Sequence, residues 1–282
     1  MAKVSEKYIA GFLDSDGSIQ VLWRPLDRKD TNPALRRAYL SLEWSQRTDR
    51  DEVLQAIRNF AGGRLSYRTI RGVQYTTLKI SGKKAEMLLS RIKKYLVNRK
   101  HYAEVVLDIL RQPVNMEVAK EFLKAHRLAK VDPKVNYPTR KWLAGYFDGD
   151  GTIDARMTRS GAAQIVASIS CMECHSYGIE TIQKNFGGSI KRWTSGNGVQ
   201  LATWTMTMPP SKVEKFFGYF GKHSIVKRPQ IDFVLSRARM GHFREGEYIR
   251  AELKRLKAQP HRLSEPGGVT PSCDSRSCLT TV

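Results

Sequence analysis

Apolar and polar residues alternate along four segments of the chain, a pattern that predicts β-strands with one apolar and one polar face. These segments are residues 18–24, 38–45, 152–158 and 164–170. One face of each strand should pack against helices, and the other should carry free polar side chains, as is common in antiparallel sheets.

Apolar residues at helical spacing predict helices between and after the strands. A hairpin is predicted in each half, with Arg71 and Gly72 as the first turn and residues 195–198 as the second. The order is then αββαββα, twice, and the fold class is α/β (α+β), with antiparallel sheets in two pseudo-symmetric halves. Besides the first helix of each half, the predicted helices are residues 49–60, 83–95, 100–111, 173–186, 211–220 and 228–239.

An internal repeat relates the two halves. Residues 8–19 read YIAGFLDSDGSI, and 134 positions later residues 142–153 read WLAGYFDGDGTI. A second echo, between residues 56–68 and 181–193, has an offset of only 125. The second half has therefore lost residues from the connection after its first strand, where a loop tolerates such changes.

The repeat also predicts the domain organisation. Pro133 and Pro138 discourage a helix late in the connection between the halves. A basic helix is expected at residues 245–258, and the polar stretch after it has little to bury and is expected to be disordered. The expected parts are residues 1–113 (first half), 114–138 (linker, with a helix at 114–130), 139–240 (second half) and 241–282 (basic helix and tail).

Two adjacent small residues interrupt each otherwise bulky motif helix. These are Ala10 and Gly11 in the first half, and Ala144 and Gly145 in the second. Small residues let two helix backbones approach closely where they cross. We therefore expect the two motif helices to lie side by side.

Such packing would bring the acidic ends of the two helices together. Asp16 and Asp150 occupy these ends, and each is followed by a glycine, Gly17 or Gly151, that we expect to end the helix at a positive φ. Two carboxylates at the negative ends of helix dipoles repel each other unless a cation lies between them. Hard oxygen ligands of this kind favour Mg²⁺.

The charge of the chain points to an anionic partner. Lys and Arg number 48 against 27 Asp and Glu, so the formal net charge is +21. Nucleic acid is favoured, because neutralisation of phosphates by basic side chains dominates the affinity of DNA and RNA binders. No stretch resembles a membrane span or signal segment. A soluble intracellular protein is expected, in a bacterial cytoplasm or an organelle matrix, without a membrane or an obligate protein partner.

The four cysteines admit two interpretations. Cys171 and Cys174 have C-x-x-C spacing, and Cys273 and Cys278 could complete a zinc quartet with them. The later pair lies in the polar tail, however, so free intracellular thiols are the simpler interpretation.

The two repeated segments resemble the LAGLIDADG motifs of homing endonucleases in their monomeric, two-motif form. The resemblance covers about residues 8–239. It implies a site-specific double-strand DNA endonuclease that leaves 3′ overhangs in a long, pseudo-palindromic target. It also implies two or three bound Mg²⁺ ions, for which Mn²⁺ or Ca²⁺ could substitute in binding. The alternative function is an intron RNA maturase, with host intron RNA as partner, or a cleavage-inactive DNA-binding protein of the same fold.

The resemblance also implies roles for particular residues. Asp16 and Asp150 would bind metal, assisted by the backbone carbonyls of Ser15 and Gly149. Gln46, Arg99 and Lys227 would complete the catalytic set around them, with Arg50 and Lys100 as further cations nearby. Cys171 and His175 stand where the first half has Gln46 and Arg50, so the two DNA strands could be cut at unequal rates. Asp14 and Asp148 are expected to make polar contacts at the helix ends rather than to bind metal.

The polar faces of the strands are expected to form a saddle over the major groove of DNA. Arg68, Lys79, Lys191 and Arg192 could meet either base edges or phosphates. Trp44 and Trp204 belong to the apolar side of their strands. The expected contacts are Gln20, Arg24, Arg37, Tyr39, Ser41, Glu43, Arg68, Tyr75, Thr77, Lys79, Asp154, Arg156, Thr158, Gln164, Ser168, Lys191, Trp193, Thr203 and Thr205.

Overall fold

The computed structural model describes residues 4–25, 35–111, 113–130, 132, 138–241 and 243–258. The expected disordered tail lies outside these described residues. In the first half the elements are α1 (Glu6–Ser15), β1 (Gly17–Pro25), β2 (Leu35–Arg47), η1 (Thr48–Arg50), α2 (Glu52–Ala61), β3 (Arg64–Ile70), β4 (Val73–Ser81), α3 (Lys83–Ile92), η2 (Lys93–Tyr95) and α4 (Lys100–Ile109).

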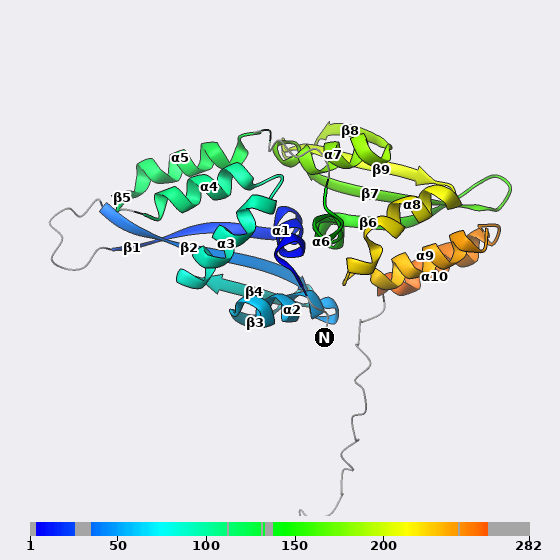
Figure 1. Cartoon of the computed structure of the whole chain (residues 1–282), viewed down its shortest axis with the longest axis horizontal. Coiled ribbons are helices and arrows are strands. Elements are labelled where there is room, and N and C mark those ends of the chain that lie inside the picture. The colour runs from blue at the N-terminus through cyan, green and yellow to red at the C-terminus, as the bar shows by residue number, and fades with distance from the viewer. Residues whose placement is uncertain are drawn as a thin grey trace, which may run out of the picture.

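The second half repeats this order after a connecting segment (Figure 1). Between the halves lie β5 (Val114–Asn115) and α5 (Met116–Leu128). The second half consists of α6 (Arg140–Asp150), β6 (Gly151–Met157), β7 (Ala163–Met172), η3 (Glu173–His175), α7 (Tyr177–Phe186), β8 (Ser189–Thr194), β9 (Gln200–Met208), α8 (Pro210–Phe220), η4 (Gly221–His223) and α9 (Arg228–Arg239), followed by α10 (Gly246–Ala258).

Each half contains one antiparallel sheet, which confirms the predicted α+β architecture. The strand orders are β1-β2-β4-β3 and β6-β7-β9-β8, and the short β5 pairs with β2. The first hairpin turns at Arg71 and Gly72 as predicted, and their φ angles of 50° and 78° suit a type I′ turn. The registers also correspond, because Gly17 lies opposite Trp44 and Gly151 lies opposite Ile169.

The predicted alternation separates a core face from a free face in both sheets. Leu40, Leu42 and Trp44 are buried on β2, and Trp204 is buried on β9, so both tryptophans belong to the core as expected. Full burial of an apolar side chain of this size contributes about 1.5–3 kcal/mol. Apolar side chains of the helices pack against this face in the hydrophobic core.

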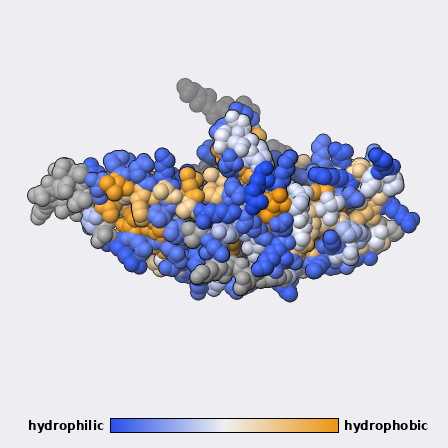
Figure 2. Space-filling view, turned by 90° about the horizontal axis from the view of Figure 1, so that it is seen from above, coloured by the Kyte–Doolittle hydropathy of each residue, from blue (hydrophilic) through white to orange (hydrophobic). Residues whose placement is uncertain are grey.

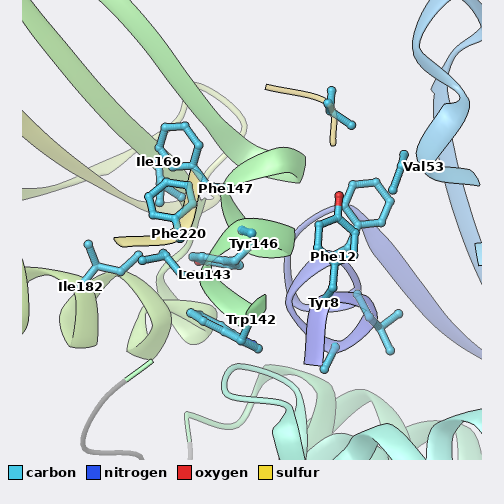
Figure 3. Packing of buried hydrophobic residues seen from close by; sticks show 14 of the residues in the cluster. Tyr8, Phe12, Val53, Trp142, Leu143, Tyr146, Phe147, Ile169, Ile182 and Phe220 are labelled. Atoms are coloured by element: carbon cyan, nitrogen blue, oxygen red, sulfur yellow. The ribbon is translucent and has the colours of Figure 1, made fainter. Parts of the chain in front are cut away.

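The helices α1 and α6 form the centre of the molecule, and each belongs to the core of its own half (Figure 3). Phe12 of α1 points toward Val53 of the first half, whereas Phe147 of α6 points toward Ile169 and Phe220 of the second. Both helices begin at a hydroxyl cap, since the side chains of Ser5 and Thr139 accept hydrogen bonds from backbone N–H groups in the first turn.

Glycines allow the backbones of α1 and α6 to touch. A Cβ on Gly11 would lie 2.0 Å from the carbonyl oxygen of Trp142. A Cβ on Gly145 would lie 2.1 Å from the carbonyl oxygen of Tyr8. Real Cβ contacts are never this short, so the predicted close crossing is confirmed and depends on glycine at both positions.

The glycines after the two aspartates serve a different purpose from the one expected. Neither Gly17 nor Gly151 has a positive φ; Gly151 has φ −72° and ψ 147°. Both positions are instead crowded, because a Cβ on Gly17 would lie 2.4 Å from Leu13 Cδ1 and one on Gly151 would lie 2.4 Å from the Phe147 carbonyl. The expectation of a positive φ was wrong: glycine is required here by lack of space.

The surface of the described residues is mainly hydrophilic on the face that carries α5 (Figure 2). Hydrophobic side chains gather over the first half, and Val118 and Phe122 of α5 are among the exposed ones. None of the described helices is both long enough and apolar enough to cross a lipid bilayer.

We predict that Gly11→Ala destabilises the protein. The added methyl group must push α1 away from α6, which costs about 1–3 kcal/mol and lowers Tm by roughly 2–4 °C per kcal/mol. Gly218→Ala is the matched control, because it also replaces a helical glycine but no atom lies within 4 Å of the new Cβ. The control should be neutral or up to about 1 kcal/mol more stable. Thermal unfolding measures both, and a Gly11→Ala protein as stable as the control would contradict the packing argument.

Candidate active site

The contact between α1 and α6 places Asp16 and Asp150 next to each other. The two helix ends are so close that a Cβ on Gly149 would lie 2.1 Å from Ser15 Oγ and 3.2 Å from Asp16 Cβ. The motif of the second half therefore needs glycine where the first half has serine. Both aspartates are half-buried.

The electrostatics of the two carboxylates show that they interact. Burial and the neighbouring Asp16 raise the pKa of Asp150 to about 7, although Arg99 and Lys227 act in the opposite direction. Burial also raises the pKa of Asp16, against the same two cations. Like charges in a half-buried site favour protonation or a bound cation.

Gln46 comes to this site from the end of β2. Its side-chain amide donates a closely approaching hydrogen bond to Asp16 Oδ2. The predicted placement of Gln46 beside the first aspartate agrees with this contact, and its catalytic role stays a prediction.

Arg99 and Lys227 also act on the two aspartates, and each is the residue immediately before a helix. Arg99 precedes α4, and its guanidinium donates hydrogen bonds to the carbonyl of Ser15 at 3.3 Å and to that of Gly17. Lys227 precedes α9 in the same way. Burial lowers the pKa of both cations, and nearby carboxylates oppose that shift.

Asp14 and Asp148 hold these two cations in place through the backbone. Asp14 accepts hydrogen bonds from the N–H groups of Val97 (2.6 Å) and Arg99 (3.0 Å). Asp148 accepts them from Ile225 (2.6 Å) and Lys227 (2.9 Å), among others. Both carboxylates are almost fully buried, so their expected role in polar contacts at the helix ends agrees with the structure.

Each of these buried carboxylates also accepts a hydrogen bond from the other half of the molecule. Tyr8 of α1 donates through its hydroxyl to Asp148 Oδ2 at 2.6 Å. Trp142 of α6 donates through Nε1 to Asp14 Oδ2 at 3.0 Å. The first aromatic residue of each motif therefore supports the loop that carries the cation of the opposite half.

The donor set fits a divalent metal of the Mg²⁺ type. Asp16 and Asp150 offer carboxylate oxygens, and backbone carbonyls are close by at the helix ends. No cluster of three or more His, Cys, Asp or Glu side chains suited to a metal occurs among the described residues. A metal here would therefore complete its shell with water and phosphate oxygens, as Mg²⁺ commonly does.

Cys171 takes the place in the second half that Gln46 takes in the first. Each lies two residues beyond the partner of the helix-ending glycine on its strand. Burial raises the pKa of the Cys171 thiol to about 12, and Tyr146 is its hydrogen-bond neighbour. Cys171 and Cys174 are free thiols, and the other two cysteines of the hypothetical zinc quartet lie outside the described residues.

The strand registers place the expected DNA contacts on the free faces of the two sheets. Ser41 is one exception, because it is fully buried with its Oγ 3.3 Å from Ser81 Oγ. The expectation that Ser41 meets DNA was therefore wrong for this conformation. On the first sheet the face carries Gln20, Arg24, Arg37, Tyr39, Glu43, Arg68, Tyr75, Thr77 and Lys79. On the second it carries Asp154, Arg156, Gln164, Ser168, Lys191, Trp193, Thr203 and Thr205. Thr158 follows β6, and its hydroxyl bonds to Ser160 and Ala162 in the turn before β7, so no strand register places it on this face.

Some charges near these faces are already paired. Lys79 Nζ lies 2.8 Å from Glu43 Oε1. Arg192, unlike Lys191, turns toward α7 and pairs with Glu173 and Glu180 at 2.9 and 2.8 Å. Arg192 is therefore a structural residue in this conformation, and Lys191 is the free cation of β8.

Comparison with known proteins agrees with this geometry. Residues 9–106 match the family model described as LAGLIDADG endonuclease. The matched residues make up about a third of the chain and lie in its first half. The internal repeat relates the second half to these matched residues. No characterised protein matches the chain in a search of curated sequences.

Solved structures of LAGLIDADG proteins share the fold of nearly the whole chain. The homing endonuclease I-GzeII in complex with its DNA target aligns with a TM-score of 0.65 and 16% identity, over 90% of this chain and 97% of the other. The homing endonuclease I-SmaMI bound to cleaved DNA aligns with a TM-score of 0.61 and 18% identity, over 91% and 96%. I-SmaMI bound to uncleaved DNA in the presence of calcium ions gives 0.59 and 16%, over 90% and 98%.

The hydrogen bonds between the two halves could not be found from the sequence. Tyr8 and Trp142 occupy the same position of the repeat, but one is a phenol and the other an indole. Each looks like an ordinary core aromatic. The only available signal was that both side chains carry a hydrogen-bond donor, which seeks a partner when it is buried.

We predict that Asp148→Asn destabilises the protein more than Tyr8→Phe. Asparagine places an NH₂ group among N–H and O–H donors, and hydrogen bonds to a charged acceptor contribute about 1.5–3 kcal/mol each. Tyr8→Phe removes one donor and leaves the backbone donors to Asp148 in place. Denaturant unfolding at neutral pH measures both changes, and equal stability of Asp148→Asn and the wild type would contradict the assigned role.

Proposed function

We propose that this protein is a site-specific endonuclease that cuts both strands of a long, pseudo-palindromic DNA target. The observation that carries the proposal is the meeting of Asp16 and Asp150 at the adjoining ends of α1 and α6, with Arg99 and Lys227 beside them. The fold is shared with I-GzeII and I-SmaMI, whose structures are described with DNA.

The proposed reaction is hydrolysis of one phosphodiester bond in each strand. The oxygen of a water molecule attacks phosphorus, the bond from phosphorus to the 3′ oxygen breaks, and that oxygen takes up a proton. A 5′-phosphate and a 3′-hydroxyl result, with short 3′ overhangs. Gln46, which contacts Asp16, is suited to orient the water, and Arg99 and Lys227 are suited to stabilise charge that grows on the phosphate.

Asp16 and Asp150 are the residues that would hold Mg²⁺ ions, assisted by the carbonyls of Ser15 and Gly149. Bound divalent ions would lower the pKa of the attacking water and stabilise the leaving oxygen. Because Arg99 already donates to the Ser15 carbonyl, that oxygen lies in a positively charged setting before any metal binds. Mn²⁺ or Ca²⁺ is expected to substitute for Mg²⁺ in binding.

The free faces of the two sheets are the proposed DNA surface. Their exposed cations include Arg37, Arg68, Arg156 and Lys191. Side chains that reach base edges would give sequence preference, and those that reach phosphates would give affinity. Because the two faces carry different residues, the two half-sites of the target should differ in sequence.

We predict that Asp16→Asn and Asp150→Asn each abolish cleavage and keep DNA binding. Loss of a metal ligand removes several kcal/mol of transition-state stabilisation, roughly a thousandfold in rate or more. Binding persists because one negative charge near the phosphates is gone. A plasmid library with randomised inserts is incubated with the wild type and Mg²⁺, and the insert that is cut is taken as the target. Binding of each variant to a duplex with this target is then measured by fluorescence anisotropy.

Asp108→Asn is the control for these variants, since Asp108 is an exposed carboxylate on α4 outside the site. It should cut at the wild-type rate. EDTA should reproduce the effect of the site variants. If the wild-type protein leaves the whole library uncut, or Asp16→Asn cuts as fast as the wild type, the endonuclease proposal fails.

We also predict that the two strands are cut at unequal rates. Gln46 supplies an amide to one half of the site, whereas Cys171 supplies a buried thiol to the other. Gln46→Cys should slow the faster strand by up to roughly a hundredfold and so reduce the difference. Duplexes labelled on one strand or the other report each rate. Equal wild-type rates, without a nicked intermediate, would contradict the assignment.

A further inference from the structure

A small basic pocket opens beside the proposed active site, between the two halves. Its volume is about 160 Å³, and its lining includes Ser18 of β1, Arg99, Tyr102 of α4, Arg127 of α5 and His175 of η3. This space is equal to roughly five water molecules at ~30 Å³ each, which is enough for one phosphate group. The pocket thus joins a proposed catalytic cation, Arg99, to a cation from the helix between the halves.

The pocket has a strongly positive setting. Burial, together with Arg99 and Arg127, lowers the pKa of His175 to about 4, so its imidazole is neutral at neutral pH. Arg127 has no carboxylate within ion-pair distance in the part of the chain that the structure describes. Arg99 Nε is buried and has no hydrogen-bond partner there. The pocket therefore holds donors that lack an acceptor.

The helix that supplies Arg127 has a counterpart at the end of the second half. Residues 117–127 of α5 read EVAKEFLKAHR, and residues 247–257 of α10 read EYIRAELKRLK, at a constant offset of 130. Glu, a basic residue, Leu-Lys and a final basic residue recur at the same positions. Leu123 and Leu253 are buried alike. Figure 1 shows α5 at the upper edge of the first half and α10 at the lower edge of the second, as a half-turn in the plane of the view requires.

This correspondence pairs Arg127 with Lys257, and Lys257 lies in an equivalent setting. Lys257 and Arg50 are among the charges that act on Lys227, just as Arg127 and Arg99 act together on His175. Arg50 Nε is also buried without a partner in the described chain. Lys257 does lie 3.9 Å from Asp154, but so long and exposed a contact contributes little.

We propose that Arg127 and Lys257, the last basic residues of α5 and α10, each bind a backbone phosphate of the DNA target beside one of the two cleavage positions. Arg127 forms a basic cluster with Arg99, a proposed catalytic cation, and His175 of the second half. Lys257 forms the equivalent cluster with Lys227, a proposed catalytic cation, and Arg50 of the first half. Phosphate is the ligand because each cluster offers several donors to an anion; the carboxylates beside the second cluster are Asp154, 3.9 Å from Lys257, and Asp49, which acts on Arg50. The proposal rests on the proposed endonuclease function and adds a binding site to it.

The test measures DNA binding as a function of salt with the full chain and the duplex selected by wild-type cleavage. Loss of one phosphate contact reduces the slope of log K against log salt by about 0.9. Arg127→Ala and Lys257→Ala should each show this reduction and weaken binding roughly ten- to a hundredfold. Because the clusters contain different catalytic cations, each variant should slow the cutting of a different strand.

The same helices provide matched controls. Lys124→Ala and Lys254→Ala each remove an exposed lysine three residues before the tested cation, at equivalent positions of α5 and α10. Both should keep the wild-type salt slope and cleave both strands normally. Arg127→Lys keeps a positive charge at the position and should restore the slope, which a merely structural role for Arg127 does not predict.

The outcomes separate the two proposals. If the wild type cuts its selected duplex but Arg127→Ala and Lys257→Ala keep its salt slope and strand rates, the phosphate sites are wrong and the endonuclease proposal stands. Failure of Arg127→Lys to restore the slope, with Arg127→Lys folded to the wild-type Tm, would also overturn the phosphate site. If no duplex is bound or cut by the wild type, the endonuclease proposal itself fails.

Discussion

The backbone contact between α1 and α6 is the constraint on which the rest of the molecule depends. Because Gly11 and Gly145 have no side chains, the two helices approach until each presses on the other's carbonyl groups. The contact carries the ends of both helices into one place and makes two separate cores share one central pair of helices. Without it, Asp16 and Asp150 would be two unrelated surface carboxylates.

Bringing like charges together has an energetic cost that the surrounding residues reduce. Arg99 and Lys227 act on both aspartates, and burial makes those interactions stronger than they would be in water. These cations are themselves held by the buried carboxylates Asp14 and Asp148. Negative and positive groups therefore alternate through the site: Asp14 and Asp148 position the two cations, and the cations reduce the repulsion between Asp16 and Asp150.

Much of the fold followed from the repeat and from strand alternation. A pattern with period two determines which face of a strand is apolar, so the faces of both sheets were predictable residue by residue. Ser41 was the exception on the polar face, because exposure depends on neighbours across the sheet as well as on parity. The positions of Asp16, Gln46 and Arg99 relative to one another followed from the resemblance to a known family and agree with the structure.

Other features depend on contacts that no local pattern encodes. A crowded glycine and a glycine with positive φ look alike in a sequence, and only the surroundings of Gly17 and Gly151 distinguish them. The sequence predicted α5 as part of a linker. The structure places Arg127 of α5 beside Arg99, and this position draws attention to the sequence match between α5 and α10.

The hydrogen bonds of Tyr8 and Trp142 limit how the halves of such proteins can be recombined. A chimera that joins this first half to the second half of a relative inherits a buried aspartate whose donor comes from the foreign partner. If that partner lacks a phenol or indole at the position of Trp142, Asp14 loses a donor and the loop before α4 loses a support, even when the sheets and the central glycines are compatible. Successful exchange of halves therefore requires these two aromatic residues to be chosen together with the aspartates that they serve.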